Sequence, residues 1–586
     1  VGLLQVCFSF PLAFFCYSIV CRLDFFPFLN FLGLFVIMGI GVDDLFVVVD
    51  KWSQAARSLP PGSDVPTIAA VAGPDAALTM LLTSLTTAAA FFATAVVPVA
   101  PVRVFAIFMG FMVLADYLLC LTVTFSAVCL QHRWLQRAPS SRRARCLLSL
   151  LDFSRCSSRP PQEAAAPRAR VLERLMSGPM HTAVHRGRFV LLALFFAALG
   201  LCVWQVANIS PPSSTAVQLL PESHVVERYE TWKQDFAEED SSEMFVVWGL
   251  TPGDTGDHNN PELVTDLLAD LDWDPSSREA QRWLLDFCNA TASDPAAPRA
   301  TDIGCPLRDM DDWLVDSAAA GQPRCGGASR LPVPPDAFHP CVEEYLSSNS
   351  WYRGMRTYRG RLVALVASYK VVINFDSSYE QVRDTVDEWE GWMDTQNKGA
   401  PDGVRGGFFT SARVHWWDTN RSMLLGAYYS IGAALAVVFV VVLLATLNPL
   451  TTVYATVSVG TVLLLVIGTV LGMGWELGFL EGICFAILIG LSCDFVLHMA
   501  HAYTSADQPT RELKSRDALA RMGPPVFAAA MTTLSTGLVM FGCTFVFFFQ
   551  FGAILVLTML YSILTSLFFF LPLTNAAGPT GRCCSL

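Results

Sequence analysis

Apolar residues are gathered along this chain in long runs, each close to the roughly 20 residues that a helix needs to cross a bilayer core of about 30 Å. Any one run could be a buried core helix of a soluble protein, but so many runs of nearly full length leave that interpretation little room. The pattern therefore predicts a polytopic α-helical membrane protein. Its ten expected spans are Val1–Val20, Phe28–Val49, Ala76–Val97, Val104–Cys129, Phe189–Val206, Met423–Leu447, Tyr454–Leu471, Gly478–Ala500, Val526–Phe547 and Phe551–Leu571.

The charged residues between these runs predict the orientation of the spans. The segment Gln131–Arg188 holds about a dozen arginines and three acidic residues. Because basic loops stay on the cytoplasmic side, we expect residues 130–188 to form a cytoplasmic linker. Alternation then places a second basic loop, around Arg511–Arg521, and the tail 576–586 on the same side. It places the acid-rich stretch 207–421 outside, with five more spans in residues 422–575.

The outer segment is long enough to form a domain of its own. Its residue pattern predicts strands over Met244–Leu250 and Leu362–Phe375 and helices over Arg278–Asn289 and Ser378–Gln396, and hence an α+β fold. An even number of extracellular cysteines suggests two disulfides, with three pairings open among Cys288, Cys305, Cys325 and Cys341. Glycosylation sequons stand at Asn208, Asn289 and Asn420.

Composition excludes several classes of function. Hydrophobic residues make up 53% of the chain and charged residues 15%, against about 25% charged residues in soluble domains. The net charge of −12 argues against a nucleic-acid partner. The sequence has no P-loop, zinc-ligand spacing or nucleophile elbow, so we expect neither an enzyme nor an ATP-driven pump. The chain starts inside an apolar run without an initiator Met, and we interpret it as a piece of a longer protein.

An internal repeat relates the two groups of spans. A shift of 451 residues lays Gly39 on Gly490 and Asp43 on Asp494. The next span of each group repeats as well, since Ser84–Thr87 matches Thr533–Thr536. Repeated halves with polar groups near the midplane are typical of transporters. Small polar residues alone would be weaker evidence, because they also serve helix packing.

The repeated aspartates carry the candidate chemistry. Asp43 lies about 15 residues into its span, roughly 22 Å at the helical rise, Asp44 follows it, and Asp494 reaches a similar depth. A carboxylate at the bilayer centre costs roughly 2.5–3.5 kcal/mol, and neither span supplies a Lys or Arg to neutralise these acids. We therefore expect them to bind Na⁺ or H⁺ as a coupling ion. The alternative is that they are protonated and hydrogen-bonded without transport.

Other polar residues within the spans are open to two interpretations. Asp116 is a fourth intramembrane acid and a further candidate for cation coupling. Gly39, Gly41 and Gly490 are candidates for close helix packing. His498 and His501 could relay protons, although such histidines more often mark the wet end of a helix. The terminal Cys583–Leu586 fits a prenylation pattern, or only reflects where the chain stops.

These motifs resemble the resistance-nodulation-division (RND) superfamily, and within it the Dispatched family. The resemblance rests on the run Gly39–Asp44, on its partner in the second half, on the paired Thr/Ser helices, and on four further stretches. Those stretches are Phe25–Asn30, His415–Met423, Gly490–Phe495 and Gly578–Gly581. The likeness covers nearly all of the membrane part and is weak across the outer domain.

The resemblance implies a protein of twelve spans and two outer domains, with residues 1–129 as four spans of a sterol-sensing domain. It implies that Asp43, Asp44 and Asp494 bind the coupling cation, Na⁺ in Dispatched-like members. Bacterial relatives pair two aspartates with a Lys in the later helix, where this chain has Asp494.

Two functions from different classes remain after this comparison. The first is a cation-driven transporter of a sterol, a lipid or a lipid-modified secreted protein, in the plasma membrane or an endomembrane. The second is a Patched-like sterol sensor or receptor that binds a protein ligand without pumping. Both would keep the aspartates, so the sequence does not separate them.

Overall fold

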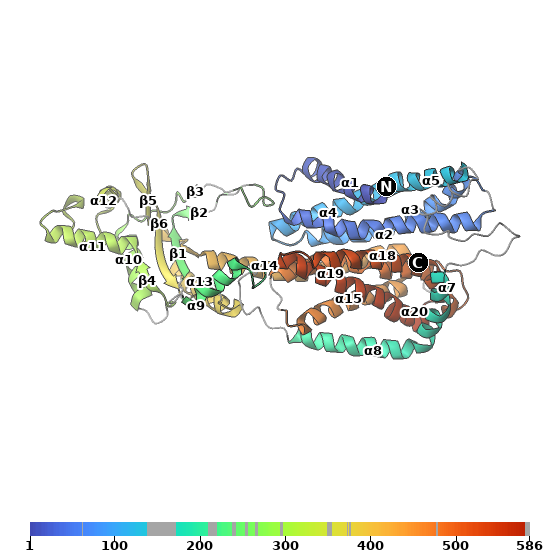
Figure 1. The fold of residues 1–586 in the computed structure, drawn as a ribbon. Coiled ribbons are helices and arrows are strands. Elements are labelled where there is room, and N and C mark those ends of the chain that lie inside the picture. Colours follow the sequence, from blue (N-terminus) through green and yellow to red (C-terminus); the bar gives the residue numbers. More distant parts are fainter. Residues whose placement is uncertain are drawn as a thin grey trace. The chain divides into compact units, whose positions relative to one another are not determined.

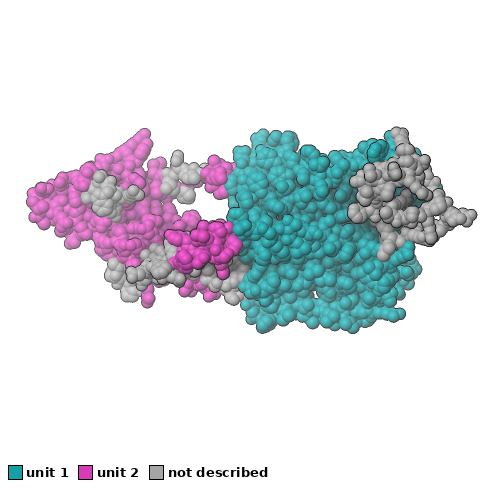
Figure 2. Space-filling model, viewed as in Figure 1, with its two compact units in different colours: residues 1–209, 423–586 teal, residues 210–422 magenta. Residues whose placement is uncertain are grey.

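The computed structural model describes the chain except residues 61–62, 138–170, 209–218, 237–241, 252, 254–255, 264–267, 294–296, 349–353, 372, 374–376, 476–478 and 581–586. The described chain forms two compact units, residues 1–209 with 423–586 and residues 210–422, coloured separately in Figure 2. Most of the predicted linker 130–188 and the terminal Cys583–Leu586 motif lie outside the described residues.

The first unit is a bundle of long helices (Figure 1). Its first half contains α1 (Gly2–Phe15), α2 (Leu29–Ser58), α3 (Val65–Thr94), α4 (Ala100–Leu119), α5 (Phe125–Arg137), α7 (Val171–Leu175) and α8 (His181–Ala207). Its second half contains α14 (Ala412–Thr446), α15 (Pro449–Gly472), α16 (Phe479–Ser492), α17 (Asp494–Thr504), α18 (Arg511–Met540), α19 (Val546–Thr565) and α20 (Leu571–Ala577). π-Helical turns continue α1, α4, α7 and α19 as η1 (Cys16–Val20), η2 (Cys120–Thr124), η3 (Met176–Met180) and η6 (Ser566–Phe570).

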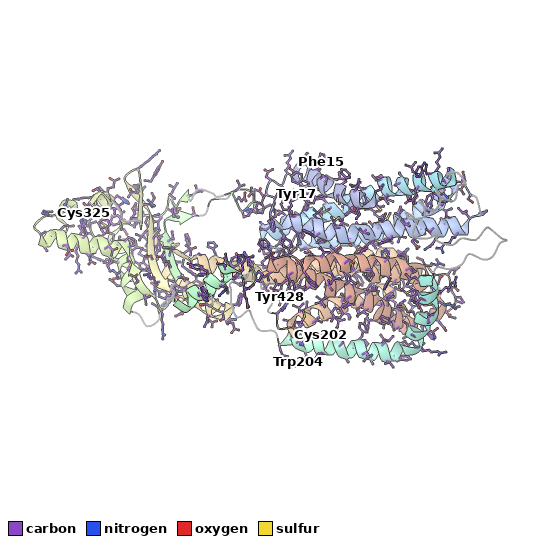
Figure 3. The ribbon with its side chains drawn as sticks, viewed as in Figure 1. Phe15, Tyr17, Cys202, Trp204, Cys325 and Tyr428 are labelled. Atoms are coloured by element: carbon purple, nitrogen blue, oxygen red, sulfur yellow. A yellow bond between two sulfur atoms is a disulfide. The ribbon has the colours of Figure 1, made fainter. Side chains whose placement is uncertain are left out.

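Helices of this unit have the length and composition of membrane spans. Eight helical segments among the described residues are long and apolar enough to cross a bilayer. Large apolar side chains cover their outside, as Phe15, Trp204 and Tyr428 illustrate in Figure 3, with exposed fractions of 51%, 63% and 59%. Such a surface suits contact with lipid. The expectation of a multi-span helical membrane protein is therefore confirmed.

Local sequence explains where several of these helices begin and how closely they pack. Asn448 caps α15, because its side chain accepts the amide of Thr451, and Pro449 takes the first helical position. Thr510 caps α18 through the amide of Leu513. Gly468 of α15 leaves room for Cys202 of α8, since an added Cβ would lie 2.5 Å from the Cβ of Cys202.

Three spans differ from the sequence-based prediction. The span expected over Val526–Phe547 falls on α18, which runs from Arg511 to Met540, and the predicted end lies in α19. The span expected over 478–500 is interrupted at Cys493 between α16 and α17, with Asp494 as the first residue of α17. No Pro or Gly marks that position, so the local sequence gave no signal for it. The span expected to begin at Met423 is part of α14, which starts at Ala412, within the second unit.

The second unit is an α+β domain built on an antiparallel sheet. The strand order is β4-β6-β1-β7, and β5 pairs with β6. The strands are β1 (Ser242–Trp248), β4 (Thr301–Gly304), β5 (Met355–Tyr358), β6 (Arg361–Val371) and β7 (Phe408–Thr410), and a separate pair joins β2 (Leu250–Thr251) to β3 (Leu268–Ala269). β1 and β6 pair from Ser242 opposite Val371 to Trp248 opposite Leu365.

The helices of this unit are α9 (Val225–Phe236), α10 (Arg278–Ser293), α11 (Pro306–Ala319), α12 (Pro335–Ser348) and α13 (Tyr379–Gly399), with 3₁₀ turns η4 (Cys325–Gly327) and η5 (Asp402–Val404). The predicted strands and helices correspond to β1, β6, α10 and α13. A capping box starts α13, in which the hydroxyl of Ser378 accepts the amide of Gln381. Fully buried aromatic side chains fill the core, among them Trp248, Phe287, Tyr369 and Trp389.

Candidate functional site

Four intramembrane carboxyl groups line one cavity. Asp43 and Asp44 stand in the middle of α2, Asp116 is near the end of α4, and Asp494 begins α17. The cavity has a volume of about 30 Å³, and one water needs roughly 10–15 Å³ measured in the same way. It can therefore hold about two waters, or one small cation with a water. The further polar residues along its wall are Thr83, Ser84, Thr87 and His498.

Hydroxyl groups from the paired Thr/Ser helices contact three of these acids. Thr87 of α3 donates to Asp494 Oδ1 at 2.8 Å, and Ser84 of the same helix donates to Asp44 Oδ2 at 3.2 Å. Thr532 of α18 approaches Asp43 Oδ1 at 3.4 Å, a long contact for a hydroxyl donor. Each of these three carboxyl groups therefore has a hydroxyl neighbour.

The two halves interlock at this cavity. α2 of the first half packs against α18 of the second, and α16 and α17 of the second half pack against α3 of the first. The contacts of Asp43 with Thr532 and of Asp494 with Thr87 thus both join residues of opposite halves. A shift of one half against the other would change the surroundings of both acids together.

The predicted packing glycines lie at these helix contacts, and they differ in how much room they leave for an added side chain. An added Cβ at Gly39 would lie 3.2 Å from Thr533 Cγ2, and the hydroxyl of Thr533 donates to the Gly39 carbonyl at 3.1 Å. At Gly41 the Cβ would lie 2.8 Å from Asp116 Oδ2. At Gly490 the nearest atom is 3.4 Å away, an ordinary contact. An added Cβ would therefore displace the Asp116 carboxyl group at Gly41, require a small shift of Thr533 at Gly39, and fit at Gly490.

The residues along the cavity wall provide no compensating basic group. Lys and Arg are absent from the wall, and Lys51 of α2 instead pairs with Asp75 of α3 at 2.8 Å. Among the residues that the structure describes, no three His, Cys, Asp or Glu side chains form a metal-binding group. A site of carboxyl and hydroxyl oxygens with room for water suits a proton or a monovalent cation better than a structural metal.

The two histidines of α17 differ in their placement. His498 follows Asp494 by one helical turn and lines the cavity. His501 is not part of the wall, and its Nε2 lies 3.5 Å from the hydroxyl of Ser505, the residue that follows α17. The proposed proton relay thus has one member in contact with the cavity.

Sequence reasoning missed Gln5 and Thr124. Gln5 of α1 donates to Asp116 Oδ1 at 2.7 Å, and Thr124 of η2 donates to Gln5 Oε1 at 2.7 Å. Gln5 also borders a wide apolar groove of about 650 Å³ along α1, whose wall includes Phe8, Leu119 and Val123. A lone Gln in an apolar span was the only signal available in the sequence.

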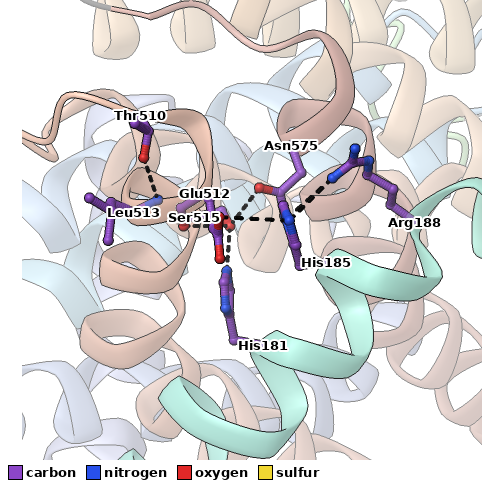
Figure 4. Close-up of polar contacts among 8 residues, drawn as sticks. All are labelled: His181, His185, Arg188, Thr510, Glu512, Leu513, Ser515 and Asn575. Atoms are coloured by element: carbon purple, nitrogen blue, oxygen red, sulfur yellow. Dashed lines mark hydrogen bonds and ion pairs between the residues drawn. The ribbon is translucent and has the colours of Figure 1, made fainter.

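A second polar cluster joins α8, α18 and α20 (Figure 4). His181 Nε2 lies 3.1 Å from the hydroxyl of Ser515, which donates to Asn575 Oδ1 at 3.0 Å. His185 Nε2 lies 3.7 Å from a carboxyl oxygen of Glu512. These contacts hold the start of α18, the helix that carries Thr532 farther along.

In the second unit, the structure pairs Cys288 with Cys305 and Cys325 with Cys341. Among the sequons, Asn208 and Asn289 are exposed, whereas Asn420 is buried within α14 with 8% of its surface accessible. A glycan at Asn420 would require that side chain to leave its buried position. We therefore keep only Asn208 and Asn289 as candidate glycosylation sites.

Comparison with known families adds two matches. Residues 2–150 match the model of the sterol-sensing domain of SREBP cleavage-activation, and residues 375–582 match the MMPL family model.

Individual relatives extend the likeness over nearly the whole chain. Protein dispatched homolog 1 of Mus musculus is 28% identical over 98% of this chain and 40% of its own length. Protein dispatched of Drosophila melanogaster is 27% identical over 98% of this chain and 52% of its own length. The chain thus spans about half or less of the length of these two relatives.

The fold is also found in a solved structure. The hedgehog release protein Disp from the water bear Hypsibius dujardini superimposes with a TM-score of 0.72 and 22% sequence identity, over 98% of this chain and 66% of that one.

Proposed function

We propose that this chain uses a cation gradient to move or release a sterol, a lipid or a lipid-modified protein. The proposal starts from its family, because the chain belongs to the Dispatched family of RND/MMPL membrane proteins with a sterol-sensing domain. The family is one of RND transporters and not of enzymes. One observation carries the proposal: carboxyl groups from both repeated halves line a single cavity.

The proposed mechanism couples ion binding to a movement of the two halves. A cation that crosses the membrane releases about 2.3 kcal/mol per 100 mV, and this energy does work only if the ion binds one conformation better than another. The contacts of Asp43 with Thr532 and of Asp494 with Thr87 join opposite halves. Neutralising the acids would weaken both contacts together, so that ion binding and the packing of the halves depend on each other.

Na⁺ and H⁺ are both candidate coupling ions, and both act here as transported substrates rather than resident cofactors. The proposed cargo follows from the relatives, since one of them is a hedgehog release protein and this chain matches a sterol-sensing domain model. We further propose that residues 207–421 lie outside the cell or in a lumen, and that residues 130–188 and 576–586 lie in the cytoplasm.

The decisive test is release of cargo from cells that express a full-length version of the protein. We expect release of a labelled sterol or a lipid-modified protein to depend on an imposed Na⁺ or H⁺ gradient. We expect Asp43→Asn and Asp494→Asn to abolish the gradient-dependent part at unchanged surface expression. Release that is insensitive to both gradients in the wild type would refute the proposal.

A second function is favoured by the match of residues 2–150 to a sterol-sensing domain. In that case the protein would be a Patched-like sensor or receptor that binds sterol and a protein ligand without pumping. Its signature would be saturable sterol binding whose loss alters signalling, with no gradient-dependent release.

A further inference from the structure

Asp116 differs from the other acids of the cavity in how it is held. Its carboxyl group meets an amide rather than a hydroxyl, because Gln5 Nε2 donates to Asp116 Oδ1 at 2.7 Å and to the Asp116 backbone carbonyl at 3.2 Å. Both side chains are almost fully buried, with exposed fractions of 2% each. A buried amide that donates to both the carboxyl group and the backbone carbonyl of Asp116 restricts where that carboxyl group can point.

The orientation of the Gln5 amide is fixed from its other end. The hydroxyl of Thr124 donates to Gln5 Oε1 at 2.7 Å, so the oxygen faces η2 and the nitrogen faces Asp116. An ionised carboxylate only accepts hydrogen bonds, and it therefore suits the N–H group that Gln5 directs at Asp116 Oδ1. The amide of Gln5 is satisfied in an arrangement that favours the charged form of Asp116.

The opposite side of the carboxyl group is shaped by a missing side chain. A Cβ on Gly41 of α2 would lie 2.8 Å from Asp116 Oδ2 and 3.0 Å from Val6 Cγ2. Asp116 therefore lies between a donor on α1 and the bare backbone of α2. Both Asp43 and Asp44 follow Gly41 closely on that helix and line the same cavity.

We propose that Gln5 is a positioning residue of the cation-coupling site, which links the charge state of Asp116 to the packing of α1. This inference rests on the proposed function. Hydrogen bonds to an ionised carboxylate are roughly twice as strong as bonds to a neutral group. When a cation or proton neutralises Asp116, α1 is held less firmly against α4, so ion binding at the cavity is transmitted to α1.

The test compares the ion dependence of cargo release for variants of the full-length protein. Gln5→Leu removes the donor at similar size, and Ser9→Ala serves as the matched control. Ser9 is a buried polar residue one turn farther along α1, and its hydroxyl donates to the carbonyl of Val6 in its own helix. Because the bond from Gln5 favours the ion-free form of Asp116, we expect Gln5→Leu to lower the half-activating ion concentration roughly tenfold, about 1.4 kcal/mol, and Ser9→Ala to leave it within about twofold.

A double-mutant cycle separates positioning from general packing. Gln5→Leu should have no further effect on the half-activating concentration in an Asp116→Asn background, because the group that it positions is then uncharged. Gln5→Glu keeps the shape but replaces the amide donor with a carboxyl group, so it should lower the half-activating concentration at least as far, and it also covers a folding failure of Gln5→Leu. Effects of Gln5→Leu and Asp116→Asn that multiply, or Gln5 variants that change only the maximal rate, would overturn the proposal.

A readout without transport keeps this inference distinct from the proposed function. Hydrogen exchange of residues 2–15 in the purified full-length protein should rise when the coupling ion is added, and Gln5→Leu should abolish that response. Absence of any gradient-dependent release in the wild type would refute the proposed function. An ion response of α1 that is unchanged in Gln5→Leu would refute the role of Gln5.

Discussion

Replacing Thr87 with Val tests whether the contact between the two halves contributes to ion binding. The change removes one hydroxyl at nearly constant shape, and with it the 2.8 Å bond to Asp494 Oδ1. A hydrogen bond to a charged group contributes about 1.5–3 kcal/mol, and about 1.4 kcal/mol corresponds to a factor of ten. Because neutralising Asp494 weakens this bond, its removal favours the ion-bound form, and we expect the half-activating Na⁺ concentration for cargo release to fall roughly tenfold to a hundredfold.

The adjacent residue provides a matched control for this variant. Thr86 is fully buried, and its hydroxyl bonds to the Leu82 and Thr83 carbonyls of its own helix rather than to an acid. Thr86→Val should change the half-activating concentration by no more than about threefold. If the coupling ion is H⁺, the same difference should appear as a shift of the pH midpoint by about one to two units in Thr87→Val alone. Equal behaviour of the two variants would refute the assignment of Thr87 to the ion site.

Two further predictions concern packing and pH. Gly39→Val should lower both thermal stability and release, because even an added Cβ would lie 3.2 Å from the methyl group of Thr533. Gly460→Ala should be neutral, because no atom lies within 4 Å of an added Cβ there. Equal melting temperatures of the two variants would contradict this prediction. Burial lowers the pKa of His339, whose Nδ1 accepts the amide of Leu362. Because the unfolded chain then binds more protons, the second unit should lose stability as pH falls below the ordinary histidine value of about 6.5. Hydrogen exchange at the start of β6 should increase at pH 5 in the wild type more than in His339→Gln, and an equal increase would contradict the role of His339.

Much of the membrane architecture was predictable because each span carries its own signal. A run of apolar residues specifies a spanning helix without reference to the rest of the chain, and the 451-residue repeat identified Asp43 and Asp494 as related groups. The break at Cys493 was not predictable, since it lies between Ser492 and Asp494 without Pro or Gly.

The partners of the acids depend on tertiary packing and were largely beyond reach of the sequence. Thr87 meets Asp494 across 407 positions of the chain, and Gln5 meets Asp116 across 111. The repeat indicated that the Thr/Ser helices belong to the site, but not that each would contact an acid of the other half. In the second unit, β4 and β7 have four and three residues and lie at the edges of the sheet, too short for a periodic pattern to appear.

The most direct test of the central claim is gradient-driven release by the Asp43→Asn, Asp494→Asn double variant of the full-length protein. Asn keeps the size of the carboxyl group and removes its charge, and the loss of a buried charge should ease membrane insertion rather than impair it. Release of a labelled sterol or lipid-modified protein would be measured under an imposed Na⁺ or H⁺ gradient and normalised to surface expression. We expect the wild type to release cargo against its gradient and the double variant to lose this activity while remaining well expressed. A well-expressed double variant that still releases cargo against its gradient would contradict coupling through these aspartates and favour a sensor or a passive conduit.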